Sequence, residues 1–179
     1  MDVLRWVGDG DAQVAVLLLI LGAGFVVLAW REMRHRPPTD GSRFWQDLAV
    51  LVALGIVVIA TLLTTSGRDE PPQLRLLPLA NLIDAIAGHG SLRGALAEML
   101  ANVLLFAPLG MALSWRFPSL GVVRITLATL AVSVGVEVLQ AVEQAGRWAS
   151  TTDVLMNALG GMIGALAAGA GPVTSPQDS

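Results

Sequence analysis

The segment from Ala95 to Trp115 reads ALAEMLANVLLFAPLGMALSW, and Glu98 is its single charged residue. An α-helix needs about 20 mostly apolar residues to cross the ~30 Å hydrocarbon core of a bilayer. This segment has the required length and therefore predicts a transmembrane helix. The whole chain has a similar character, because 54% of its 179 residues are hydrophobic, 14% are charged, and the mean hydropathy is +0.67. A membrane protein is the expected class.

Four further apolar runs flank this segment, at residues 12–30, 47–64, 120–141 and 153–170. We therefore expect an all-α, polytopic transmembrane bundle of about five membrane-spanning helices. The chain divides into an N-terminal helix with a basic cytoplasmic loop at residues 1–47, a helical core at 48–171, and a disordered tail at 172–179.

The stretch 65–94 is polar and contains three prolines, which predicts a long loop. Within this loop, four apolar residues share one face of a short helical pattern: Leu79, Leu82, Ile83 and Ile86. We expect this short amphipathic helix to lie at the membrane interface.

Arginines indicate the orientation of the helices. The loop after the first helix holds Arg31, Arg34, Arg36 and Arg43, whereas the N-terminus holds only Arg5. Loops rich in positive charge stay in the cytoplasm, so this first loop should be cytoplasmic. Five crossings then place the N-terminus outside and the C-terminus in the cytoplasm. We expect a multi-pass protein of the cell membrane.

This topology brings polar residues from three helices to the outer leaflet. The candidate ligand-binding residues are Asn102 on the third helix, Glu137 and Gln140 on the fourth, Arg147 in the following turn, and Asp153 and Asn157 on the fifth. Polar side chains are costly in hydrocarbon. Their convergence predicts either contacts between helices or a functional site.

Each candidate has two interpretations. Glu137 either meets interfacial water or pairs with Arg147, or it acts as a proton acceptor. Arg147 either neutralises an acidic neighbour or grips a phosphate or carboxylate ligand. Asp153 completes a capping box with Ser150, which does not exclude a second role. The amides of Asn102, Gln140 and Asn157 either join helices or contact a ligand.

Spacing predicts which helix faces meet. Polar residues recur every three or four positions along one face of the fourth helix: Thr126, Thr129, Ser133, Glu137 and Gln140. On the fifth helix, Gly160 and Gly164 allow close backbone approach, so this helix should pack centrally or join a homo-oligomer. Pro108 should bend the third helix, with Gly110 providing slack.

Several other classes of function are disfavoured. The net charge of −3 offers no basic face for nucleic acid. The chain has no cysteine, and its two histidines, His35 and His89, each stand alone, so neither a metal site nor a cofactor is expected. The lipid bilayer is the expected partner, and a lipid-linked envelope precursor is a candidate ligand.

Three motifs together resemble the VanZ-like family. They are Asn102-x-x-Leu105-Phe106-x-Pro108-Leu109-Gly110, then Glu137-x-x-Gln140, then Gly146-Arg147-x-x-Ser150-x-x-Asp153-x-x-x-Asn157-x-x-Gly160-Gly161. The resemblance covers about residues 74–170. It departs from the family at one place, where Arg75-Leu76-Leu77-Pro78-Leu79 stands in the position of an Asn-Leu-x-Pro-Phe segment.

The family is named for a teicoplanin-resistance protein of glycopeptide-resistant bacteria. The resemblance therefore implies a polytopic protein of the bacterial cell envelope, with lowered glycopeptide susceptibility in the founding member. It implies no particular reaction.

Three hypotheses follow. In the first, the protein is not an enzyme, and its outer polar cluster binds a lipid-linked or cell-wall-derived ligand. In the second, it is a membrane enzyme acting on a phospholipid or isoprenoid-linked substrate, with Glu137 as general base. In the third, the polar residues only assemble helices or a homo-oligomer.

Overall fold

Helices form the whole regular structure of the part of the chain described by the computed structural model, which comprises residues 21–27, 29–31, 40–63, 77–142 and 150–169. For residues 40, 61–63 and 139–142 only the backbone is described. The elements are α3 (Asp40–Leu63), α4 (Ala80–Ile86), α5 (Leu92–Arg116), the short 3-10 helix η1 (Pro118–Leu120), α6 (Gly121–Val142) and α7 (Thr151–Ala167). No strand occurs among these residues, so the predicted all-α class is confirmed for them.

Three helical stretches are long and apolar enough to cross a membrane: Gly41–Ala60, Leu92–Arg116 and Pro118–Val138. The protein is thus a membrane protein with at least these candidate spans. α7 has 17 residues, and the apolar helix at Leu21–Arg31 is shorter still. The expected total of five spans stays a prediction, because residues 12–20 lie outside the described part, as does the tail at 172–179.

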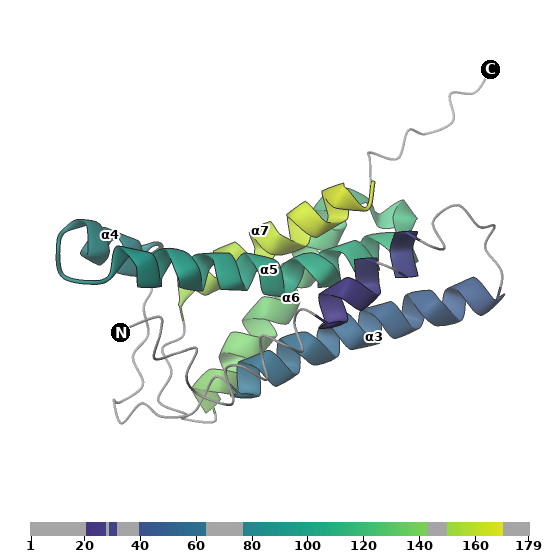
Figure 1. Ribbon diagram of the computed structural model, residues 1–179, viewed down its shortest axis with the longest axis horizontal. Coiled ribbons are helices and arrows are strands. Elements are labelled where there is room, and N and C mark those ends of the chain that lie inside the picture. Colours follow the sequence, from purple (N-terminus) through teal and green to yellow (C-terminus); the bar gives the residue numbers. More distant parts are fainter. Residues whose placement is uncertain (1–20, 28, 32–39, 64–76, 143–149, 170–179) are drawn as a thin grey trace, which may run out of the picture.

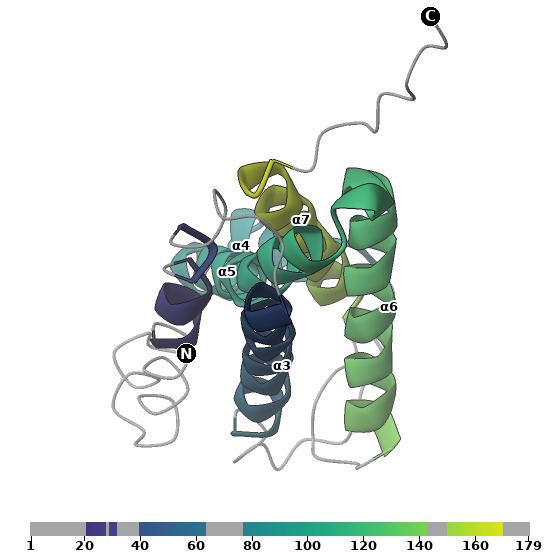
Figure 2. The same cartoon turned by 90° about the vertical axis from the view of Figure 1, so that its right-hand side faces the viewer.

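α5 is the central helix of the bundle. It packs along α7 over the most extensive contact in the structure, and it also contacts α3, α4 and α6. Figure 1 shows α4 folded back beside the beginning of α5. Figure 2, turned by 90°, shows α3 and α6 as two separate helices extending to one side of the α5–α7 pair. We call the end of the bundle that carries α4 the α4 end; α5 and α7 begin there, and α6 ends there.

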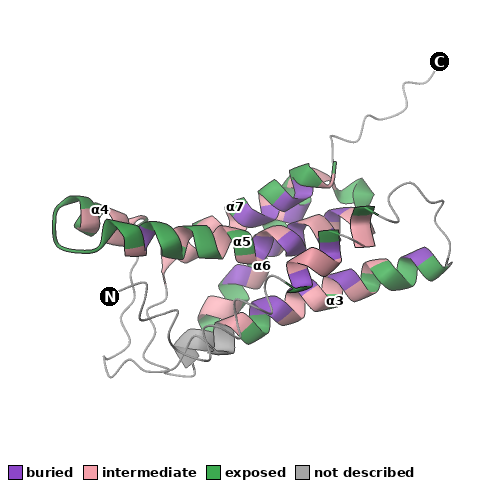
Figure 3. Cartoon of the chain, in the orientation of Figure 1, coloured by how far each residue is buried: buried purple, intermediate pink, exposed green. Residues whose placement is uncertain are grey.

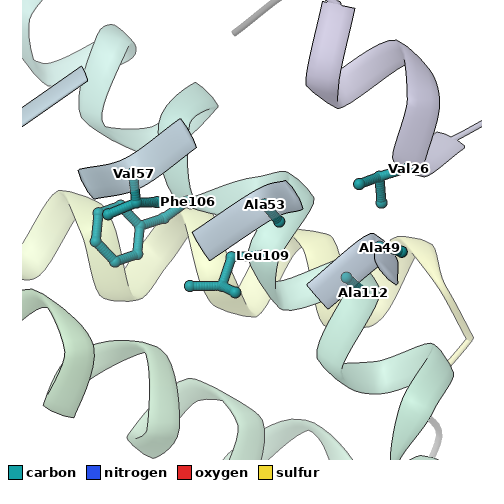
Figure 4. Close-up of a cluster of buried hydrophobic side chains, with 7 residues drawn as sticks. All are labelled: Val26, Ala49, Ala53, Val57, Phe106, Leu109 and Ala112. Atoms are coloured by element: carbon teal, nitrogen blue, oxygen red, sulfur yellow. The ribbon is translucent and has the colours of Figure 1, made fainter. Parts of the chain in front are cut away.

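An apolar core joins α3 to α5. Ala49, Ala53 and Val57 recur every four residues on α3, so they form one face, which meets Phe106 and Leu109 of α5. Figure 4 shows these side chains together with Val26 and Ala112. The two alanines leave room for the backbones to approach, and the larger side chains fill the remaining space.

Large apolar side chains also cover the outward faces of the helices. Leu51, Leu104, Val123 and Leu166 are each at least half exposed. In Figure 3 the exposed positions alternate with buried ones along every long helix. Helices that are apolar on their outer faces as well as their inner ones are typical of a protein surrounded by lipid.

Glycines bring the backbones of α5 and α7 together. A side chain at Gly160 would overlap the carbonyl oxygen of Val103, and one at Gly164 would overlap that of Ala107. On the opposite helix, a side chain at Gly110 would overlap the carbonyl oxygen of Gly161. Small residues on both helices therefore permit this contact.

The contacts of these glycines affect two predictions from the sequence, namely the oligomer contact and the role of Gly110. Gly160 and Gly164 contact α5 of the same chain, so an oligomer, which stays a prediction, would use another surface. Gly110 serves as a contact surface toward Gly161, and its role as slack beside Pro108 stays a prediction. α5 continues as one helix through Pro108, which is buried.

Candidate functional site

A hydrogen bond joins α5 to α7 at the α4 end. The side-chain amide Nδ2 of Asn102 donates to Oδ1 of Asp153 at 2.7 Å, across 51 positions in the chain. Both side chains are half-buried. A hydrogen bond in partly buried, low-dielectric surroundings is stronger than one in water. The bond therefore fixes how the first turn of α7 lies against α5.

A second hydrogen bond joins α7 to α6. Asn157 is 4% exposed, and its Nδ2 donates to the hydroxyl oxygen of fully buried Ser133 at 2.8 Å. The other polar atom of this amide, Oδ1, has no hydrogen-bond partner among the described residues. An unsatisfied buried acceptor costs about 1–3 kcal/mol. Asn157 Oδ1 is therefore the one buried side-chain nitrogen or oxygen atom of the described residues that has no hydrogen-bond partner.

The polar stripe of α6 faces α7, as its spacing predicts. Thr129 and Ser133 are fully buried, and Thr129 lies where a side chain at Gly161 would otherwise stand. The Thr129 hydroxyl donates to the carbonyl of Thr126 at 2.9 Å, so this hydroxyl is satisfied within its own helix. Within this stripe, Thr129 thus packs against α7, and Ser133 forms a hydrogen bond with α7.

Glu137 contacts the start of α7. Its Oε2 accepts a hydrogen bond from the backbone N–H of Ser150 at 3.2 Å. Ser150 is the N-cap of α7, and its own side chain makes no capping hydrogen bond. The helix therefore begins where the motif predicts, but the Ser150 half of the expected capping box is absent. A carboxylate from α6 at this terminus is favourable, since helix N-termini carry partial positive charge.

The structure brings four of the six expected site residues together. Ser133 and Glu137 lie one turn apart on α6, and Asp153 and Asn157 lie one turn apart on α7. Three hydrogen bonds connect the helices here: Asn102 to Asp153, Asn157 to Ser133, and the Ser150 N–H to Glu137. We call Asn102, Ser133, Glu137, Asp153 and Asn157 the polar cluster. The backbone of Gln140 lies in α6, but its side chain is not described, and Arg147 lies outside the described residues.

α4 is anchored beside this polar cluster. The backbone N–H of Leu79 donates to Oγ1 of Thr152 at 2.7 Å, and Nδ2 of Asn81 donates to Oε2 of Glu98 at 3.1 Å. The expected short helix is present, and Ile83 and Ile86 on it are exposed. Sequence reasoning did not single out Thr152 as an anchor. The feature of the sequence that could have pointed to Thr152 is its position next to Asp153.

Replacing Thr152 with valine tests this anchor. Valine has nearly the same shape but no hydroxyl, so the Leu79 N–H loses its acceptor at a cost of about 1–3 kcal/mol. We expect faster amide exchange in residues 79–87, measured by hydrogen–deuterium exchange mass spectrometry, with unchanged exchange in α3. Thr126→Val is the matched control, because the Thr126 hydroxyl bonds only to the Val122 carbonyl within α6. Equal exchange at residues 79–87 in both variants would contradict the anchoring role.

Comparison with known proteins places this arrangement in a family. Residues 18–170 match the VanZ/LLP1 family, and this span contains every helix described above. The chain belongs to the VanZ/LLP1 family. The predicted VanZ-like resemblance is confirmed, and it extends further toward the N-terminus than residue 74. No curated protein and no solved structure matches the chain.

The polar cluster of this VanZ/LLP1 protein is rich in hydrogen-bond acceptors. The carboxylates of Glu137 and Asp153 accept bonds from Ser150 and Asn102, and Asn157 Oδ1 is a further acceptor. The described residues include no group of three or more acidic or histidine side chains placed to hold a metal ion. Hydroxyl, amide and ammonium groups are hydrogen-bond donors, so they are the groups that could bond to these acceptors.

Proposed function

We propose that this VanZ/LLP1 protein acts in the bacterial cell envelope by binding a lipid-linked or cell-wall-derived ligand. The polar cluster forms the site, together with Gln140 and Arg147. Binding there would alter susceptibility to glycopeptides such as teicoplanin. In the proposed orientation the N-terminus lies outside and the C-terminus in the cytoplasm, so the α4 end faces the outer leaflet, where such ligands are found.

The observation that carries this proposal is Asn157 Oδ1. A buried amide that serves only to join helices would be expected to use both of its polar atoms. Here Nδ2 is used by Ser133, while Oδ1 has no partner among the described residues. A hydroxyl or amide donor from a ligand would satisfy this acceptor. Half-buried Glu137 and Asp153 lie closer to the ends of α6 and α7, and half-buried Asn102 bonds Asp153. These three side chains would contact the same ligand.

Replacing Asn157 with leucine tests the site. Leucine has a similar size but no hydrogen-bonding group, so a ligand donor would lose its acceptor. We expect affinity for an isoprenoid-linked peptidoglycan precursor, measured on the purified protein by tryptophan fluorescence, to fall about five- to a hundredfold. In cells, the same variant should fail to restore the teicoplanin susceptibility phenotype of a deletion strain.

Ser114→Ala is the matched control. It removes another buried hydrogen bond between α5 and α7, from the Ser114 hydroxyl to the Ala165 carbonyl at 3.4 Å, at the end opposite to α4. Both variants should lower thermal stability, but only Asn157→Leu should lower affinity. If both lost stability while affinity and phenotype stayed unchanged, the polar residues would serve only to assemble helices, and the binding proposal would be wrong.

A membrane enzyme with Glu137 as general base is the alternative. It is supported by the position of Glu137, which is half-buried near the end of α6 and oriented by the Ser150 N–H. Turnover of the bound precursor, abolished by Glu137→Gln while binding is kept, would favour this alternative.

A further inference from the structure

The described charges are divided between the two ends of the bundle. At the end opposite to α4, four arginines stand against one aspartate: Arg31, Arg43, Arg116 and Arg124 against Asp47. At the α4 end, four carboxylates stand against one arginine: Asp84, Glu98, Glu137 and Asp153 against Arg93. Counting the described side chains, one end thus carries three net positive charges and the other three net negative ones.

The arginines at the end opposite to α4 differ in exposure and in ion pairing. Arg116 forms an ion pair with Asp47, and its guanidinium also lies 4.9 Å from the centre of the Phe117 ring. Arg31, Arg43 and Arg124 are exposed. They come from the last turn of the N-terminal helix and the first turns of α3 and α6 (Figure 1). Three exposed arginines on three helices therefore lie at the same end of the bundle.

Aromatic side chains lie at the same level. Phe44 and Trp45, beside Arg43, are 61% and 43% exposed, and Phe117 is 40% exposed. The Trp45 ring also lies 6.4 Å from the ring of Phe25, which ties α3 to the N-terminal helix. Exposed aromatic residues at helix ends are typical of the headgroup region of a bilayer. They place the arginines at the depth of the lipid phosphates.

We propose that this basic end, formed by the four arginines with Phe44, Trp45 and Phe117, is a docking surface for anionic phospholipid headgroups. Guanidinium groups match the geometry of phosphate and bind it through paired hydrogen bonds. The surface is continuous with apolar helix faces that lipid covers, so its occupant is a lipid rather than a soluble protein. This inference does not depend on the ligand proposed for the polar cluster.

The test compares lipids that differ only in headgroup charge. The purified full chain in detergent is titrated with phosphatidylglycerol or phosphatidylcholine of identical acyl chains, and apparent dissociation constants are measured by native mass spectrometry. An arginine near an anionic surface contributes about fivefold in affinity. The double variant Arg43→Gln/Arg124→Gln should therefore lose roughly twenty-five-fold of its preference for phosphatidylglycerol.

Arg93→Gln is the matched control, because Arg93 is an exposed arginine at the α4 end of α5. It should leave the preference unchanged, and Arg43→Lys/Arg124→Lys, which keeps the charges but not the paired hydrogen bonds, should retain a part of it. Equal binding of both lipids by the wild type, or an equal loss in Arg93→Gln, would overturn the proposal. A wild-type salt titration gives an answer even if the double variant does not fold, since raising NaCl must weaken the preference through screening.

Discussion

Gly164→Val should separate α7 from α5 and destabilise the protein by about 3 kcal/mol or more. A Cβ atom at this position would overlap the carbonyl oxygen of Ala107 and lie 2.8 Å from the backbone nitrogen of Met111. Both atoms belong to the backbone of a continuous helix and cannot rotate away, so α7 would have to shift. The shift would also break the bond between Asn102 and Asp153. Thermal unfolding of the purified protein in detergent measures the loss.

Gly135→Ala is the matched control for this prediction. Gly135 lies on an exposed part of α6, and a side chain there would meet nothing within 4 Å. Alanine is the better helix former by about 1 kcal/mol, so this variant should unfold at the same or a higher temperature. If valine at position 164 were tolerated as well as alanine at 135, the close contact between α5 and α7 would be wrong.

Phe106→Ala should cost about 2–4 kcal/mol. Phe106 is 1% exposed and fills the core between α5 and α3, next to Val57 and Leu109 (Figure 4). In a membrane the unfolded helices remain in an apolar solvent, so lost packing around the cavity, rather than transfer from water, causes most of the effect. Unfolding by denaturing detergent, followed by circular dichroism, provides the measurement.

Leu104→Ala on the same helix serves as the comparison. Leu104 is 50% exposed on the outer face of α5, where lipid chains can fill the space that a smaller side chain leaves. We expect it to cost less than about 1 kcal/mol. Similar costs at positions 104 and 106 would mean that α3 does not pack against α5 through Phe106.

The helices could largely be predicted from the sequence because their cause is local. Apolar runs at 95–115 and 120–141 correspond closely to α5 at Leu92–Arg116 and α6 at Gly121–Val142. α3 differs, because it begins at Asp40 rather than near residue 47. A search for apolar runs stops at polar residues, whereas a helix continues through Ser42, Arg43 and Gln46 into the headgroup region.

The pairings within the polar cluster depend on tertiary structure and could not be predicted in the same way. Helical spacing correctly assigned Ser133 and Glu137 to one face of α6, but it did not reveal that Ser133 bonds Asn157. The motif before α7 predicted a capping box of Ser150 with Asp153. It could not show that the Ser150 N–H bonds Glu137, because that carboxylate comes from a neighbouring helix. Sequence shows which groups need partners, and packing decides which partners they find.

The contacts of α7 have a consequence for how the protein is made. α7 follows α5 and α6 in the chain, yet it provides Asp153 and Asn157, and its glycines meet both α5 and α6. Since α5 and α6 precede α7 in the chain, Asn102 and Ser133 lack these partners until α7 has been synthesised. The polar cluster is completed only when α7 enters between them.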